Sequence, residues 1–175
     1  MPTLHLLRHA KSSWDDPALA DFDRPLAPRG VAAALRMGGH LREQGIVPAL
    51  VLCSTGRRTR QTWDLVVPAL IGTPVVEFRD DLYEAPPDRL LATLRETPAE
   101  MEAVLLLGHN PGLQDLARHL AGTESDRRAL KRLHRKFPTA ALAGFEIDRA
   151  WAGLAEGGAR LTSFVRPKDL KPTRR

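Results

Sequence analysis

The sequence is poor in cysteine: Cys53 is the only one among 175 residues, so no disulfide can form within the chain. A lone thiol fits a reducing compartment and excludes the disulfide-rich class of small secreted folds, so we predict a cytoplasmic location. No apolar run approaches the roughly 20 residues that span a bilayer, and the first residues lack the basic and apolar pattern of a signal peptide. We therefore expect no membrane partner.

Aromatic side chains are also scarce, at 5% of the residues, and no known nucleic-acid motif is present. Because binding of single-stranded nucleic acid relies on aromatic stacking, we expect no nucleic-acid partner, although the net charge of +5 suits anionic ligands. The sequence has no dense cluster of metal ligands such as His-x-x-x-His, and we expect no metal and no other cofactor.

Short apolar runs alternate with amphipathic stretches along the chain. Strands are expected at about residues 3–8, 50–53, 75–78, 103–107, 140–147 and 159–165, with helices between them and a long polar loop at 11–24. This alternation predicts one α/β domain with a mostly parallel sheet over residues 1–165. A basic C-terminal tail is expected at 166–175.

Polar side chains follow three of the predicted strands. Arg8 and His9 come after the first strand, residues 54–62 follow the second, and His109 and Asn110 follow the fourth. The carboxyl ends of parallel strands meet at one edge of a sheet, so these groups are expected to converge. Guanidinium groups match phosphate oxygens, an imidazole can attack phosphorus, and a second imidazole can donate hydrogen bonds as charge develops. The pattern indicates a phosphoryl-transfer site.

The three blocks, in this order, resemble the motifs of the histidine phosphatase superfamily. Residues 7–10 (Leu-Arg-His-Ala) are similar to its Arg-His-Gly signature, with alanine in place of glycine. Residues 54–62 resemble the second block, which ends in Gln-Thr, and residues 108–112 resemble the third. Residues 8–12, together with 23–30, look most like the small SixA-type phosphohistidine phosphatases. The resemblance implies the phosphoglycerate mutase-like fold, a three-layer α/β/α sandwich.

The resemblance also implies roles for individual residues. His9 would be the nucleophile, and Arg8, Arg58 and His109 would hold the phosphoryl group. Ser54 could contact the phosphate or cap the helix that follows it, and both readings stay open. His9 must be neutral to attack, so its other ring nitrogen needs a partner that the sequence does not reveal.

The proton donor has several candidates. Many superfamily members that cleave phosphate esters use a carboxylate after the third strand, and Glu84 lies in about that place; it could equally be a solvated loop carboxylate. Asp15, Asp16 and Asp21 in the first loop are alternatives. The imidazole of phosphohistidine is a far better leaving group than an alkoxide, so a weak or missing acid would favour a phosphohistidine substrate.

We therefore predict a phosphohistidine phosphatase that acts, without a metal, on a phosphorylated signalling protein. The alternatives are a phosphate monoesterase with a small phosphorylated substrate and a non-catalytic phosphoprotein-binding module, which would not need His9. We expect a monomer. The basic segment 127–136 is either a solvated helix face or a docking face for an acidic phosphoprotein.

Overall fold

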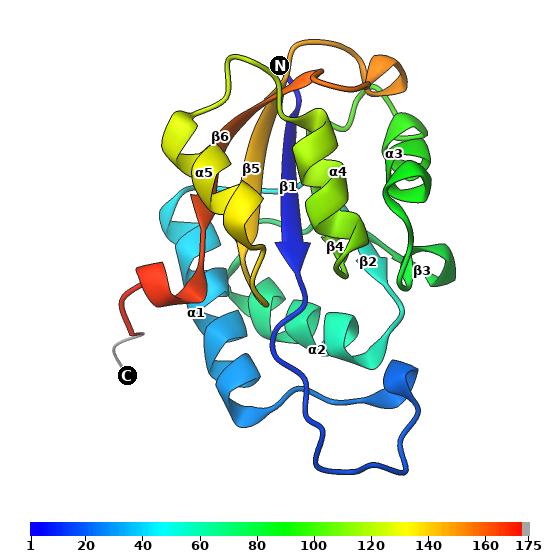
Figure 1. Ribbon diagram of the computed structural model, residues 1–175, viewed down its shortest axis with the longest axis vertical. Helices are drawn as coiled ribbons and strands as arrows, with labels where there is room; N and C mark the ends of the chain where they lie inside the picture. Colours follow the sequence, from blue (N-terminus) through cyan, green and yellow to red (C-terminus); the bar gives the residue numbers. More distant parts are fainter. Residues whose placement is uncertain (173–175) are drawn as a thin grey trace.

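The computed structural model describes residues 1–172 and is built on a six-stranded sheet in the order β3-β2-β4-β1-β5-β6 (Figure 1). The four strands from β1 to β4 are parallel, whereas β5 runs antiparallel to β1 and pairs with β6 as an antiparallel edge. The mostly parallel sheet is therefore confirmed. The strands are β1 (Thr3–Arg8), β2 (Leu50–Ser54), β3 (Val75–Arg79), β4 (Ala103–Gly108), β5 (Leu142–Ile147) and β6 (Ala159–Val165).

Helices cover both faces of this sheet (Figure 1). Alternate side chains of β1 point to opposite faces of the sheet. Leu4 and Leu6 pack in the core beneath α3, α4 and α5, and Leu7 packs in the core beneath α1 and α2. The predicted three-layer α/β/α sandwich, of the phosphoglycerate mutase-like type, is confirmed. The helices are α1 (Pro28–Glu43), α2 (Arg57–Val66), α3 (Pro87–Arg95), α4 (Gly112–Leu120) and α5 (Arg127–Arg135).

The predicted first loop passes below the carboxyl end of β1 and is organised by a buried arginine (Figure 1). The Arg24 guanidinium donates to the Ser13 carbonyl at 3.0 Å and to the Ser12 hydroxyl at 2.8 Å. It also lies 3.2 Å from the ring centre of Trp14, which is otherwise exposed. These contacts give a long polar loop a defined shape, and so fix where its acidic residues lie.

The chain continues beyond β6 into a short turn, Pro167–Asp169, in which the Asp169 carboxylate accepts hydrogen bonds from Arg166. The last three residues of the predicted tail, 173–175, lie outside the described residues, and the domain boundary at 165 stays a prediction. Within residues 1–172, none of the helices combines the length and the apolar character that crossing a membrane requires.

Candidate active site

His9 follows the last residue of β1, and the structure supplies the partner for its second ring nitrogen. Nδ1 lies 2.8 Å from the carbonyl oxygen of Ala10. A carbonyl only accepts, so Nδ1 carries the proton and Nε2 keeps its lone pair. Burial, followed by the positive charge of neighbouring groups such as Arg58, lowers the pKa of His9 to about 3. At neutral pH His9 is therefore a neutral imidazole whose lone pair is on Nε2.

Arg58 lies on the buried face of α2, whereas Arg57 and Arg60 of the same helix are exposed. The helical repeat turns successive side chains by about 100°, so only one of these three arginines faces the sheet edge. The Nε of Arg58 donates to Nε2 of His9 at 3.3 Å. The family resemblance therefore implied the role for the arginine that does reach the predicted nucleophile.

His109 approaches His9 from the end of β4, with the two ring centres 5.3 Å apart. Its Nε2 contacts the Ser54 hydroxyl at 2.7 Å, and that hydroxyl already accepts from the Gly56 amide at 3.3 Å. Within residues 1–172 the buried Ser54 hydroxyl contacts no other acceptor, so its O–H is assigned to Nε2, which leaves the His109 proton on Nδ1. This Nδ1 is buried and has no hydrogen-bond partner among residues 1–172. Burial, and then the charge of Arg58, lowers the pKa of His109 to about 3.

Ser54 is not the cap residue of the helix that follows it, and a contact between Ser54 and phosphate stays a prediction. Its side chain is completely buried at the end of β2 and contacts the His109 ring. The cap residue of α2 is Gly56, and it makes no side-chain cap. The structure places the Ser54 hydroxyl where it can orient a neighbouring histidine.

Arg8 ends β1 and is held by backbone from a distant part of the chain. Its Nη1 donates to the Phe137 carbonyl at 2.9 Å, and the same carbonyl accepts from Nδ2 of Asn110 at 3.1 Å. The Nε of Arg8 is buried, and the described part of the chain offers it no hydrogen-bond partner. Arg8 and His109 therefore each present one unpaired buried nitrogen, and a buried donor without an acceptor is costly unless an anion binds there.

Asp21, an acidic residue of the first loop, lies over the Arg58 guanidinium. The Asp21 carboxylate accepts from Nη2 of Arg58 at 3.1 Å, from Nη1 of Arg24 at 3.1 Å and from the Tyr83 hydroxyl. The Tyr83 hydrogen bond, followed by the charge of Arg58, holds the pKa of Asp21 far below its usual range. An ionised carboxylate has no proton to give, so Asp21 is poorly suited to be the acid.

Glu84 lies in the turn after β3, with a left-handed backbone at φ 49°. Its Oε1 is 3.5 Å from Nη2 of Arg58, and its side chain is 56% exposed. The turn packs tightly on the start of α4: a Cβ on Gly112 would lie 2.0 Å from the Ala85 carbonyl oxygen. Glu84 is therefore near the pocket and open to solvent. Asp15 and Asp16 are exposed in the first loop.

Three contacts of the site were not foreseen in the sequence. The Ala10 carbonyl on His9 is backbone, which has no sequence signal of its own. Thr62 accepts from the Ala10 amide at 2.9 Å, and so ties α2 to the residue after His9. Tyr83 stacks edge-on against His109, with ring centres 5.3 Å apart. The Gln-Thr ending of the second block was a sequence signal for this role of Thr62. Both residues of that pair accept hydrogen bonds from backbone amides of the N-terminal segment, Gln61 from Leu26 and Thr62 from Ala10.

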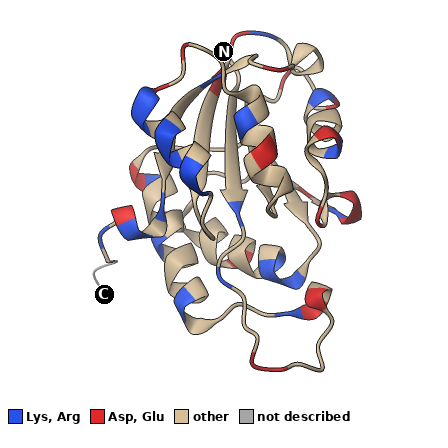
Figure 2. Ribbon diagram, in the orientation of Figure 1, with Lys and Arg blue, Asp and Glu red and all other residues tan. Residues whose placement is uncertain are grey.

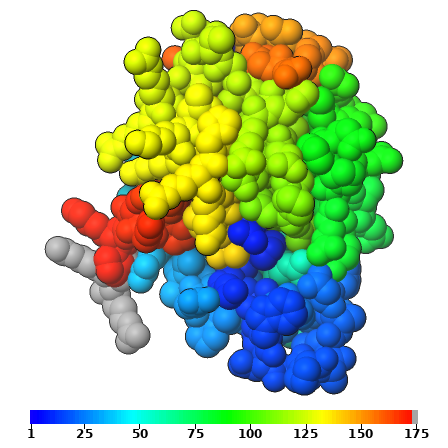
Figure 3. All heavy atoms as spheres, viewed as in Figure 1, coloured from blue at the N-terminus to red at the C-terminus, as the bar shows by residue number. Residues whose placement is uncertain are grey.

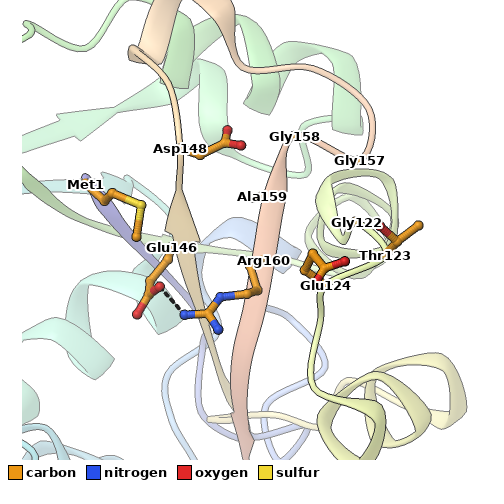
Figure 4. A pocket seen from close by; sticks show the side chains of 10 residues that line it. All are labelled: Met1, Gly122, Thr123, Glu124, Glu146, Asp148, Gly157, Gly158, Ala159 and Arg160. Atoms are coloured by element: carbon orange, nitrogen blue, oxygen red, sulfur yellow. Dashed lines mark hydrogen bonds and ion pairs between the residues drawn. The ribbon is translucent and has the colours of Figure 1, made fainter.

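A different cavity, of about 290 Å3, lies at the opposite edge of the sheet (Figure 4). It opens beside Met1, where the chain enters β1, and its lining holds none of the predicted site residues. In the described part of the chain, no three His, Cys, Asp or Glu side chains are grouped so that they could hold a metal ion. A site without a metal stays a prediction.

Together, the carboxyl ends of β1, β2 and β4 bring a neutral imidazole, two guanidinium groups and a second imidazole to one place. His9 is 6%, Arg58 4% and His109 3% exposed, so their charges and dipoles act with little screening by water. This arrangement can bind a phosphoryl group and present a nitrogen nucleophile to it.

A model of the histidine phosphatase superfamily (branch 1) matches residues 4–135. The chain belongs to this superfamily, and both the predicted family and the predicted enzyme class, a phosphatase, are confirmed. An uncharacterized protein of Mycobacterium leprae is 36% identical over 167 residues, covering 93% of this chain and 100% of that protein. An uncharacterized protein of Mycobacterium tuberculosis is 36% identical over 163 residues, with the same coverage.

Solved structures place the chain within the superfamily more closely. A structure from Nakamurella multipartitia named "putative phosphohistidine phosphatase SixA" is 33% identical, has a TM-score of 0.82, and is matched over 99% of this chain and 97% of its own. Its namesake from Agrobacterium tumefaciens is 30% identical with a TM-score of 0.79, over 95% of this chain and 99% of its own. The predicted SixA-like resemblance is confirmed.

Proposed function

We propose that the protein is a phosphohistidine phosphatase that transfers the phosphoryl group through His9. One observation carries the proposal: the Ala10 carbonyl holds the proton on Nδ1 of His9, which leaves the Nε2 lone pair beside Arg58. The relatives named as SixA support the choice of substrate. A non-catalytic binding module would need the arginines but not a nucleophile with its tautomer fixed.

In the first step, the Nε2 lone pair of His9 forms a bond to phosphorus while the P–N bond of the substrate breaks. The leaving nitrogen keeps that electron pair, and a proton from Glu84 or from water on the other ring nitrogen lets the ring leave as neutral imidazole. Arg8, Arg58 and Nδ1–H of His109 would stabilise the charge on the equatorial oxygens. In the second step, water attacks phosphorus, the bond to His9 breaks, and inorganic phosphate leaves.

The physiological substrate would be a phosphorylated protein. Imidazole leaves from phosphorus with a pKa near 6.5, roughly that of free histidine, so it needs little help from an acid. Glu84 is exposed, and its nearest charged partner is Arg58 at 3.5 Å. This weakly held carboxylate suits a phosphoramidate bond better than an alkyl ester.

The cytoplasmic location, the monomeric state and the metal-independent mechanism remain part of this proposal.

A second candidate is a phosphate monoesterase with a small phosphorylated substrate. The observation in its favour is that Glu84 does lie within reach of the pocket, where an ester-cleaving enzyme would place its acid. A substrate panel separates the two. We expect kcat/KM for a phosphohistidine peptide and for phosphoramidate to exceed that for glucose 6-phosphate by at least about 100-fold, the size of a general-acid contribution. Equal or greater rates on the sugar ester would establish the second candidate instead.

A further inference from the structure

Outside the pocket, the strongest charged feature is a groove of about 430 Å3 between α5 and the segment that follows β6. Figure 3 shows α5 in yellow and the C-terminal segment in red side by side on one face of the molecule. We call this feature the basic groove. Apart from Pro138, its lining is entirely cationic: Lys131, Arg132, Arg135, Lys136, Arg166 and Lys168.

The positive charge of the basic groove is largely unbalanced. Of the acidic residues that the structure describes, only Asp169 pairs with the lining, at 3.4 Å from Arg132 and 2.7 Å from Arg166. Lys131 and Arg135 are exposed and form no ion pair with any residue in the range 1–172. They also stand four residues apart on one helix, where like charges destabilise the helix. Within the described residues, Lys131 and Arg135 therefore contribute no ion pair to the fold.

The basic groove adjoins the active site through the backbone. Lys136 and Pro138 of its lining flank Phe137, whose carbonyl accepts the hydrogen bond from Nη1 of Arg8 at 2.9 Å. Figure 2 shows the blue segments of α5 descending toward the blue end of β1, which is Arg8. A ligand bound along the groove would thus lie next to a substrate in the pocket.

We propose that the basic groove is a docking surface for acidic side chains that flank the phosphohistidine of a protein substrate. The proposal rests on the proposed function and extends it to the partner. Exposed cations beside a site raise the rate at which an acidic partner meets it. The lining distributes its charges over two segments, the last part of α5 and the chain after β6, whereas a small ligand would need a compact cluster. Among the residues that the structure describes, no aromatic side chain lines the groove for stacking on bases, which favours a protein over a single-stranded nucleic acid.

The test compares two phosphohistidine peptides of equal length, one flanked by glutamates and one by glutamines. Wild-type enzyme is expected to show a kcat/KM about tenfold higher for the glutamate peptide at low salt, within the usual range for electrostatic steering. Lys131→Glu/Arg135→Glu should reduce this preference to about twofold or less, with phosphoramidate hydrolysis unchanged. The matched control is Arg36→Glu/Arg42→Glu on α1, which changes the charge equally on the other face of the sheet and should keep most of the preference.

The outcomes separate this inference from the proposed function. If the wild-type protein hydrolyses neither phosphoramidate nor either peptide, the proposed function is wrong. Normal phosphoramidate hydrolysis with equal rates on the two peptides, or an equal loss in the α1 control, would overturn the docking surface. Binding of the fluorescent glutamate peptide, measured by anisotropy, tests the groove independently of turnover. Duplex DNA that displaces this peptide at lower concentration than the peptide's own Kd would assign the groove to nucleic acid.

Discussion

The Asp21 carboxylate occupies the open side of the Arg58 guanidinium. Its Oδ2 lies 3.1 Å from Nη2, and its backbone carbonyl accepts from Nη1 at 2.8 Å. Arg58 itself is 4% exposed, so Asp21 lies between solvent and the guanidinium that we predict to bind phosphate. A phosphoryl group that binds Arg58 must displace or share this contact with an anion from the same chain.

Replacing Asp21 by asparagine should tighten the binding of phosphate. The side chain of Asp21 is 42% exposed, so its pair with Arg58 is partly screened, and we expect an effect of about 0.5–1 kcal/mol, or roughly two- to fivefold in the inhibition constant of inorganic phosphate. Asp16→Asn, in the same loop, is the control. Weaker phosphate binding in Asp21→Asn would show instead that Asp21 holds Arg58 in place for the substrate.

Ser54→Ala should slow the reaction through His109. The variant removes the hydroxyl that contacts Nε2 at 2.7 Å, so the ring can adopt the other tautomer and lose Nδ1–H. We expect kcat to fall by about 2- to 12-fold with KM nearly unchanged, because a hydrogen bond between two neutral groups is worth about 0.5–1.5 kcal/mol. Nitrogen NMR of the imidazole reports the tautomer directly, and Ser54→Thr should restore part of the rate. A KM effect alone would argue for a direct contact between Ser54 and substrate.

The buried histidines should make the protein less stable in mild acid. The pKa of both His9 and His109 is lowered to about 3 by burial, whereas the unfolded chain takes up these protons near pH 6.5. The unfolded state therefore binds more protons between pH 6.5 and 3, and stability is complete above this window and falls as the pH decreases through it. At pH 5 the loss should be about 2 kcal/mol per histidine.

Urea unfolding at pH 7.5, 6 and 5 measures this loss. His9→Gln/His109→Gln should have a flatter pH dependence than the wild type, and His134→Gln, at an exposed position, should not. Proton NMR of the folded protein at pH 5 should show both imidazoles still neutral. Titration of either ring near pH 6.5 in the folded state would remove the basis for a neutral nucleophile set by burial.

Replacing Glu84 should lower kcat/KM more for substrates with a poorer leaving group. Glu84→Gln is expected to leave the rate on phosphohistidine within about threefold and to slow an alkyl phosphate by about 100-fold or more, since a positioned acid contributes on that scale. The comparison needs kcat/KM for both substrates on both proteins, with Asp88→Asn in the nearby helix α3 as the control. An equal decrease on both substrates would mean that Glu84 acts on the phosphoryl group or on Arg58, not on the leaving group.

The strands and helices could be predicted because their apolar residues repeat at the strand or helix period. The run at Leu4–Leu7 is a strand, as expected, and its side chains divide between two cores in the way a sheet buried on both faces requires. The convergence of Arg8, Arg58 and His109 followed from a parallel sheet, since each lies at or just beyond the carboxyl end of its strand.

The contacts that complete the site could not be read in the same way. The Ala10 carbonyl on His9 depends on how the chain turns after β1, and every residue has a carbonyl. The position of Asp21 depends on Arg24, which folds a loop without any regular repeat. The Ser54 hydroxyl could be assigned only when its distance from the His109 ring was known. Such contacts are set by tertiary packing rather than by local pattern.

Rapid-quench trapping of the phosphoenzyme tests whether His9 is the nucleophile. The protein is mixed with a labelled phosphohistidine peptide, stopped in alkali to preserve the P–N bond, and mapped by mass spectrometry. The phosphoryl group should be found on His9, and His9→Ala should form no phosphoenzyme and lose turnover, while His109→Ala should still allow slow labelling of His9. Label on another residue, or full activity of His9→Ala, would contradict the role of His9 as the nucleophile.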